Sequence, residues 1–150
     1  MMKLLTISLL SLFSKTENSF CQQSLNPISK LFQLCKTEID SLTKEEVYIT
    51  ATTDPKPKTG INVLMKKFET DLNTDFEIDK KNYDPHIIVA FIVAQDGSIN
   101  GPRIIKDKTN SLGQQMLNIV KSLKWTPARC FDNPIKMIYQ LTMTYNPPDY

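Results

Sequence analysis

The most apolar stretch beyond the first twenty residues is HIIVAFIVA, residues 86–94. In an extended chain its side chains alternate between two faces, and both faces receive large apolar groups such as Phe91 and Ile92. A strand with two apolar faces is typical of the centre of a sheet that is covered on both sides. We therefore predict a central strand over residues 87–95.

The residues on either side of this strand in the expected sheet are also patterned as strands. Asp96-Gly97 favours the positive φ angles of a tight hairpin turn, so residues 98–107 should return beside the central strand. Pro102 cannot donate a ladder hydrogen bond, which places the return strand at an edge. The segment PIKMIYQLTMTY, residues 134–145, alternates apolar and polar positions and predicts a last strand. The expected sheet is antiparallel and three-stranded, with spatial order 2-1-3.

Two further segments carry apolar residues at helical spacing. The first begins near residue 60, and its apolar face consists of Ile61, Leu64, Met65, Phe68 and Leu72. The second begins at Ser111, for which a capping box with Gln114 is predicted. It ends at the structural motif of Trp125 and Pro127, because proline cannot continue a helix.

Packing of both helices on one face of the sheet, the face of Phe91 and Tyr139, gives an α+β fold. The opposite face would carry Ile88, Ile92 and Ile138, which is too much apolar surface to leave in water. We expect an N-terminal helix or a second copy of the protein to cover it.

The N-terminal helix is predicted over residues 27–42, since Asn26-Pro27 is a typical helix start and apolar residues follow at helical spacing. A short strand is expected after residue 46, and the loop DPKPKTG follows it. The predicted organisation is a helical extension over residues 22–46 and a main domain over residues 47–150.

Residues 1–21 have the pattern of a signal peptide. Lys3 precedes an apolar run from Leu4 to Phe13, which is about half the roughly 20 residues that a membrane-spanning helix needs. Ser19 and Cys21 fit cleavage before residue 22. The alternatives are a lipid anchor on Cys21 and an N-terminal core helix in an uncleaved chain. We expect an exported protein with no integral membrane segment after cleavage.

Removal of the signal peptide would leave two cysteines, Cys35 and Cys130. An oxidising compartment permits a disulfide between them. The alternative is that both are unpaired small hydrophobic residues, which is common for cysteines far apart in sequence.

The chemistry of the chain points to binding and not to catalysis. Eighteen Lys and Arg against sixteen Asp and Glu give a formal net charge of +2, far from the basic field typical of nucleic-acid binding proteins. The one histidine, His86, has no cysteine or histidine in ligand spacing, and no nucleophile or phosphate-binding motif occurs. We expect no enzyme activity, no metal, no cofactor and no nucleic-acid partner.

Several segments in order resemble the C-terminal domain of TonB, in the form common among Bacteroidetes. They are VYITATTDPKPKTGINVLMKKFETDL, IIVAFIVAQDGSI, SLKWTPA and NPIKMIYQLTMTY, and together they span residues 47–145. The ordered set, above all KWTPA after a helix, carries the resemblance.

The resemblance implies a protein-binding module. Domains of the TonB type add a peptide segment of an outer-membrane receptor as a strand at the sheet edge. The corresponding edge here would be the last strand. Its partner-binding side chains would be those of Lys136, Ile138, Gln140, Thr142 and Thr144. This implies a protein or peptide partner and an accessory role in TonB-dependent transport across the outer membrane. It also implies a periplasmic or secreted location in the cell envelope of a Gram-negative bacterium. The alternatives are an ordinary protected edge strand and a self-associating envelope domain that pairs as a homodimer.

The signal-peptide prediction is tested by the mass of the exported protein. We expect the mature chain to begin at Gln22 or a neighbouring residue, because small residues precede that point. Recovery of secreted material that retains Met1 would contradict the prediction.

Overall fold

The computed structural model describes residues 34–74, 83–109 and 111–146, which form a mixed α+β fold. The predicted signal peptide and the first part of the predicted N-terminal helix lie outside these residues. The described elements are β1 (Thr37–Ile39), β2 (Glu46–Tyr48), β3 (Lys56–Pro57), α2 (Ile61–Asp71), β4 (His86–Val93), β5 (Ile99–Lys106), α3 (Leu112–Ser122), β6 (Trp125–Thr126), β7 (Ala128–Cys130), β8 (Asn133–Ile135) and β9 (Met137–Thr144).

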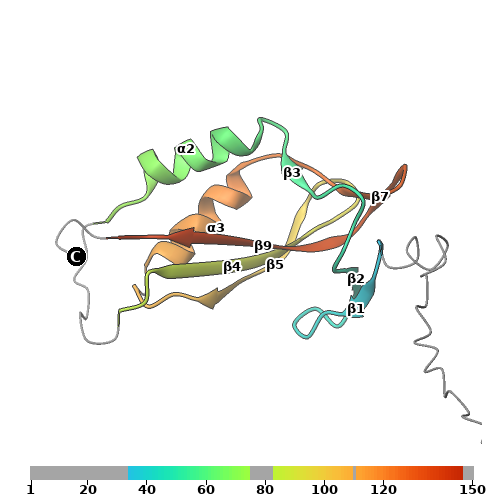
Figure 1. Cartoon of the computed structure of the whole chain (residues 1–150), viewed down its shortest axis with the longest axis horizontal. Helices are drawn as coiled ribbons and strands as arrows, with labels where there is room; N and C mark the ends of the chain where they lie inside the picture. The colour runs from blue at the N-terminus through green and yellow to red at the C-terminus, as the bar shows by residue number, and fades with distance from the viewer. Residues whose placement is uncertain (1–33, 75–82, 110, 147–150) are drawn as a thin grey trace, which may run out of the picture.

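The main sheet has five strands in the order β1-β2-β9-β4-β5, and not the three predicted (Figure 1). The predicted arrangement of its three long strands is confirmed, because β4 pairs antiparallel with β5 on one side and with β9 on the other. Two-residue and three-residue strands form two further small sheets, β3-β6 and β7-β8.

The two additional strands come from the region predicted to be helical. Residues 37–39 pair with β2 as an antiparallel hairpin, so the helix predicted over residues 27–42 is wrong for its described part. Ile39 and Leu42, two members of the expected apolar stripe, are 66% and 55% exposed. Because these side chains find no apolar face to pack against, pairing of the backbone decides the local structure.

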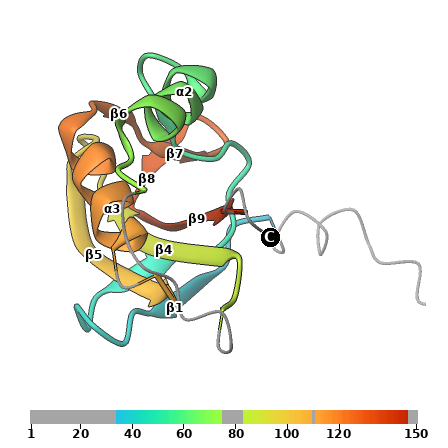
Figure 2. The ribbon, with the colours of Figure 1, turned by 90° about the vertical axis from the view of Figure 1, so that its left-hand side faces the viewer.

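Helices α2 and α3 cover one face of the sheet (Figures 1 and 2). Both helices were predicted, and Leu64 and Phe68 of α2 are buried as expected. The centre of this layer is aromatic: the Trp125 ring lies 5.1 Å from that of Phe91 and 6.1 Å from that of Tyr139. The Trp125 indole N–H donates to the Val120 carbonyl oxygen at 3.0 Å, which satisfies its only polar group in the core.

The start of α3 differs from the prediction. Ser111 makes no side-chain capping bond to the backbone, so the capping box with Gln114 is wrong. The Thr109 hydroxyl accepts the Leu112 amide at 3.0 Å, and the Asp107 carboxylate accepts the Gly113 amide at 2.8 Å. Two side chains upstream of the expected cap therefore satisfy the first amides of the helix.

Among the described residues, the β1-β2 hairpin covers part of the opposite face of the sheet, where a helix was predicted (Figure 2). Cover by a second copy stays a prediction. A Cβ atom at Gly101 of β5 would lie 2.9 Å from the Thr43 methyl carbon and 3.6 Å from Ile92, so the hairpin loop touches the sheet there. Ile92 is fully buried, whereas Ile88 and Ile138 are half-buried. The N-terminal region does cover this face, but in an extended conformation.

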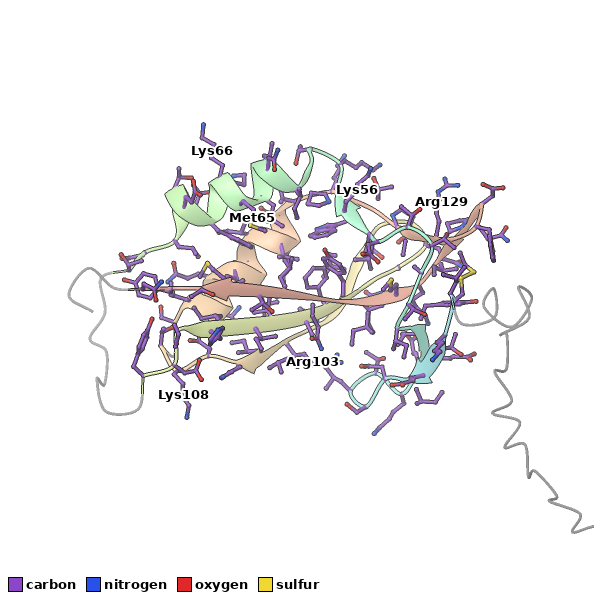
Figure 3. The ribbon with its side chains drawn as sticks, in the orientation of Figure 1. Lys56, Met65, Lys66, Arg103, Lys108 and Arg129 are labelled. Carbon is purple, nitrogen blue, oxygen red and sulfur yellow. A yellow bond between two sulfur atoms is a disulfide. The ribbon has the colours of Figure 1, made fainter. Side chains whose placement is uncertain are left out.

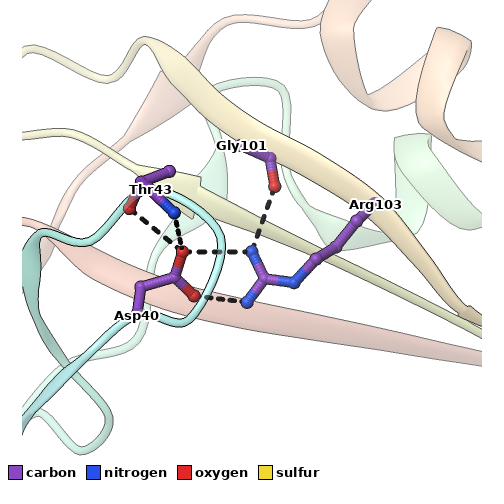
Figure 4. Close-up of polar contacts among 4 residues, drawn as sticks. All are labelled: Asp40, Thr43, Gly101 and Arg103. Atoms are coloured by element: carbon purple, nitrogen blue, oxygen red, sulfur yellow. Dashed lines mark hydrogen bonds and ion pairs between the residues drawn. The ribbon is translucent and has the colours of Figure 1, made fainter.

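A buried ion pair anchors the hairpin to the sheet (Figure 4). Arg103 of β5 donates to both carboxylate oxygens of Asp40, and it also donates to the Gly101 carbonyl at 3.3 Å. The Thr43 amide donates to the same carboxylate at 2.8 Å. This amide and then the Arg103 guanidinium hold the pKa of Asp40 below its usual value.

The Asp40→Asn variant should unfold more readily than the wild type at pH 7. The Asp40 side chain is only 2% exposed, so the substitution leaves the Arg103 guanidinium without its counter-charge. We expect a loss of about 2 kcal/mol in the free energy of unfolding, measured by denaturant titration. Glu45→Gln is the control: it removes an exposed pair with Lys136 and should cost less than about 0.5 kcal/mol.

The same pair makes stability depend on acid. Because the folded-state pKa of Asp40 is lowered, its contribution is complete above the unfolded value of 3.8 and is lost as pH falls through the folded value. The difference between the wild type and Asp40→Asn should therefore shrink below about pH 4. A difference that stays constant down to pH 2 would contradict this assignment.

Candidate functional site

The C-terminal strand β9 is paired unequally on its two sides. On one side it pairs with β4 at every position, from His86↔Thr144 to Val93↔Met137. On the other side β2 pairs with it in parallel only at Tyr48↔Met137. Within the described ranges no strand lies against the rest of this side, residues 138–144, which we call the open edge (Figure 1).

The direction of the backbone groups along β9 follows from two hydrogen bonds. The Lys136 carbonyl accepts the Tyr48 amide at 2.9 Å, on the side away from β4, whereas the Tyr145 amide donates to Pro85 on the β4 side. In an antiparallel strand, the amide and carbonyl of one residue point to the same side and successive residues alternate. The backbone groups of Gln140, Thr142 and Thr144 therefore point out of the open edge.

The side chains of β9 alternate between the two faces of the sheet. Leu141 and Tyr139 pack with the helices, while Gln140, Thr142 and Thr144 are exposed on the opposite face. Ile138 is half-buried on that face, where it lines a cavity of about 250 Å³ under the hairpin.

Lys136 does not belong to the open edge, which corrects the predicted set. Its carbonyl is occupied by Tyr48, and its ammonium group forms an ion pair with Glu45 at 3.1 Å. The sequence predicted a strand near residue 47 but did not show that this strand pairs with β9. That pairing removes Lys136 from the open edge.

An apolar cavity of about 330 Å³ lies beside the last part of the open edge, between α2, the start of α3 and the end of β9. We call it the α2–β9 cavity, and its apolar lining residues are Met65, Phe68, Leu72, Leu112, Met143 and Tyr145. Met65 points from α2 toward the sheet, whereas Lys66 points away from it (Figure 3). Met65 and Leu72 were expected on the buried face of this helix, and the apolar spacing gave no sign of a cavity. In the structure Met65 lines the cavity and remains 39% exposed.

The predicted structural motif consists of Asp96, Gly97, Trp125 and Pro127. It packs against β9 on the helix-covered face of the sheet and does not line the open edge. Gly97 has a φ of 84°, and a Cβ atom there would lie 2.2 Å from the Trp125 carbonyl oxygen. The Asp96 carboxylate accepts the Ser98 amide at 2.9 Å, which closes the turn. Pro127 is half-buried between β6 and β7. The turn and Trp125 thus form one packed unit, on which Tyr139 of β9 rests.

Cys35 and Cys130 form a disulfide with a Cα–Cα distance of 5.9 Å. Cys35 immediately precedes the β1-β2 hairpin, and Cys130 ends β7. The hairpin is therefore tied to the domain at two places, by this disulfide and by the Asp40–Arg103 pair.

A polar cluster lies at the start of β4. Asp84 forms an ion pair with Lys106, and its carboxylate lies within hydrogen-bonding distance of the His86 Nδ1 atom, at 3.0 Å. The Lys106 contact and then the His86 amide hold the pKa of Asp84 well below its usual range. No three His, Cys, Asp or Glu side chains lie together as metal ligands in the part of the chain that the structure describes.

No helix among the described residues is long and apolar enough to cross a membrane. The chain matches no known family model, no curated protein and no solved structure. The resemblance to TonB domains therefore stays a prediction that rests on the quoted segments.

The disulfide is tested by counting thiols in a chain that begins at Gln22. We expect no reactive thiol in the denatured, unreduced protein and two after reduction. Reduction should lower the free energy of unfolding by about 2–4 kcal/mol, because the bond closes a loop over 95 residues of sequence separation. Two reactive thiols before reduction would exclude the bond.

Proposed function

We propose that this protein is an exported binding module that takes up an extended segment of a partner protein as an added strand on β9. The observation that carries the proposal is the open edge: β2 covers β9 only at Met137, and the backbone groups of Gln140, Thr142 and Thr144 point outward. Main-chain hydrogen bonds to such an edge are the basis of recognition by strand addition.

The side chains around the open edge also favour an incoming strand. Edge strands that must avoid pairing usually carry charged residues, proline or a bulge. Residues 138–144 carry no charge and no proline, and their pairing with β4 has no register shift. By contrast, the outer strand β5 contains Pro102 and Arg103 and pairs with β4 through two irregularities.

The proposed location and partner draw on the sequence. The apolar run near the N-terminus favours export, and the Cys35–Cys130 disulfide supports an oxidising compartment such as the periplasm. The resemblance to TonB domains favours a periplasmic segment of an outer-membrane receptor as the partner, and with it an accessory role in transport across that membrane.

Self-association through the same edge is the second candidate. A second copy of β9 could pair with the first across a two-fold axis, and the absence of charge on residues 138–144 leaves no like-charge repulsion to oppose it. This candidate predicts that the molecular mass in solution rises with concentration.

The Thr142→Pro variant should bind segments of outer-membrane receptors more weakly than the wild type. The Thr142 amide points away from β4, so proline removes an outward donor and leaves the ladder with β4 intact. We expect about a tenfold loss of affinity for synthetic peptides that cover the periplasmic segments of these receptors, measured by calorimetry.

Thr142→Ala is the matched control, because it removes the same side chain and keeps the amide. Its affinity should equal that of the wild type. Equal affinity for Thr142→Pro and Thr142→Ala would show that the open edge is not the binding site. A dimer in sedimentation that Thr142→Pro abolishes would instead favour self-association.

A further inference from the structure

The β1-β2 hairpin shows how a strand lies on this side of β9. Tyr48 of β2 is paired with Met137, and it packs with the apolar cluster of Met137, Ala128 and Ile135. Directly opposite residues of neighbouring strands direct their side chains to the same face of the sheet. A strand on this edge therefore places the residue opposite an odd-numbered position of β9 among apolar side chains.

The open edge continues directly from β2, and the same alternation continues with it. Met143 is the odd-numbered residue at the far end of the edge, and it lines the α2–β9 cavity together with Met65 and Phe68. The residue of an added strand directly opposite Met143 would have its Cβ about 4.5–5.5 Å from that of Met143. Its side chain would enter the cavity, whose volume of about 330 Å³ corresponds to roughly ten water molecules.

The neighbouring positions of an added strand meet different surroundings. Thr142 is exposed on the opposite face of the sheet, so the residue opposite it would remain in water. Thr144 is also exposed, although it is one of the residues that line the cavity. Glu69 also lines the cavity, and its carboxylate would repel an acidic side chain there.

We infer that the partner segment of the proposed function is an amphipathic strand with one large, uncharged apolar side chain opposite Met143, flanked by polar residues. This inference rests on the proposed strand addition and goes beyond it, because it assigns the α2–β9 cavity as the site of an anchor side chain. The anchor sets the register of the partner, since a shift by one residue would place a polar side chain in the cavity and the apolar one in water.

The inference is tested with random seven-residue peptides displayed on phage and selected on the oxidised protein. Selected peptides are synthesised, and hydrogen exchange of the Gln140, Thr142 and Thr144 amides reports where they bind. We expect protection of these amides and one recurrent apolar position, at which replacement by serine weakens binding about tenfold or more.

Two variants of α2 link that position to the cavity. Met65→Gln introduces a polar group into the lining and should weaken binding of the selected peptides about tenfold. Lys66→Gln is the matched control, since the neighbouring side chain points away from the sheet, and it should leave affinity unchanged (Figure 3).

Different results would contradict the anchor side chain in the cavity and strand addition at the open edge. Peptides that protect the amides of the open edge but have no apolar preference, or bind Met65→Gln as well as Lys66→Gln, would overturn the anchor and keep strand addition. A selection that produces no peptide protecting these amides would overturn both.

Discussion

The structure depends on one constraint: β4 has apolar side chains on both faces and must be covered above, below and on both sides. Five consecutive residues of this strand, 89–93, are fully buried. Strands β5 and β9 satisfy its backbone, and the helices cover one face. Cover for the other face comes from the β1-β2 hairpin, because the buried Asp40–Arg103 pair holds it against β5. The layer arrangement follows from burying the apolar side chains of this strand, of which Ile87 and residues 89–93 are fully buried and Ile88 is half-buried.

The core that supports β9 is a small set of contacts around Trp125. Gly97 has no side chain, which lets the hairpin turn approach the Trp125 carbonyl, and the indole packs against Phe91 and Tyr139. The indole N–H of this unit is satisfied by the Val120 carbonyl oxygen. It positions a strand whose other side, among the described residues, is paired only at Met137. Backbone groups that are held in place by such packing are pre-organised for a partner.

The early end of β2 is what distinguishes β9 from an ordinary internal strand. After Tyr48 the chain leaves the sheet toward β3, and it is held there by the bridge between Thr53 and Arg129. Strand β2 therefore occupies one position of the edge and leaves the rest, while the α2–β9 cavity opens beside the far end. Backbone groups and an apolar cavity that lie side by side are the two components that recognition of an extended peptide requires.

The sequence alone was sufficient for every element with a strong period: the central strand, its hairpin, the last strand and both helices lie where the alternation of apolar residues predicted. It misassigned residues 34–42 because Ile39 and Leu42 have helical spacing, and only the tertiary contacts of the hairpin show that no apolar surface receives them. The cap of α3 was decided by the turn that brings the Asp107 carboxylate to the start of the helix. The pairing of Lys136 was decided by Glu45, a residue distant in the chain. Local periodicity is a property of the sequence, whereas the length of an open edge depends on where another segment stops, which only the folded chain determines.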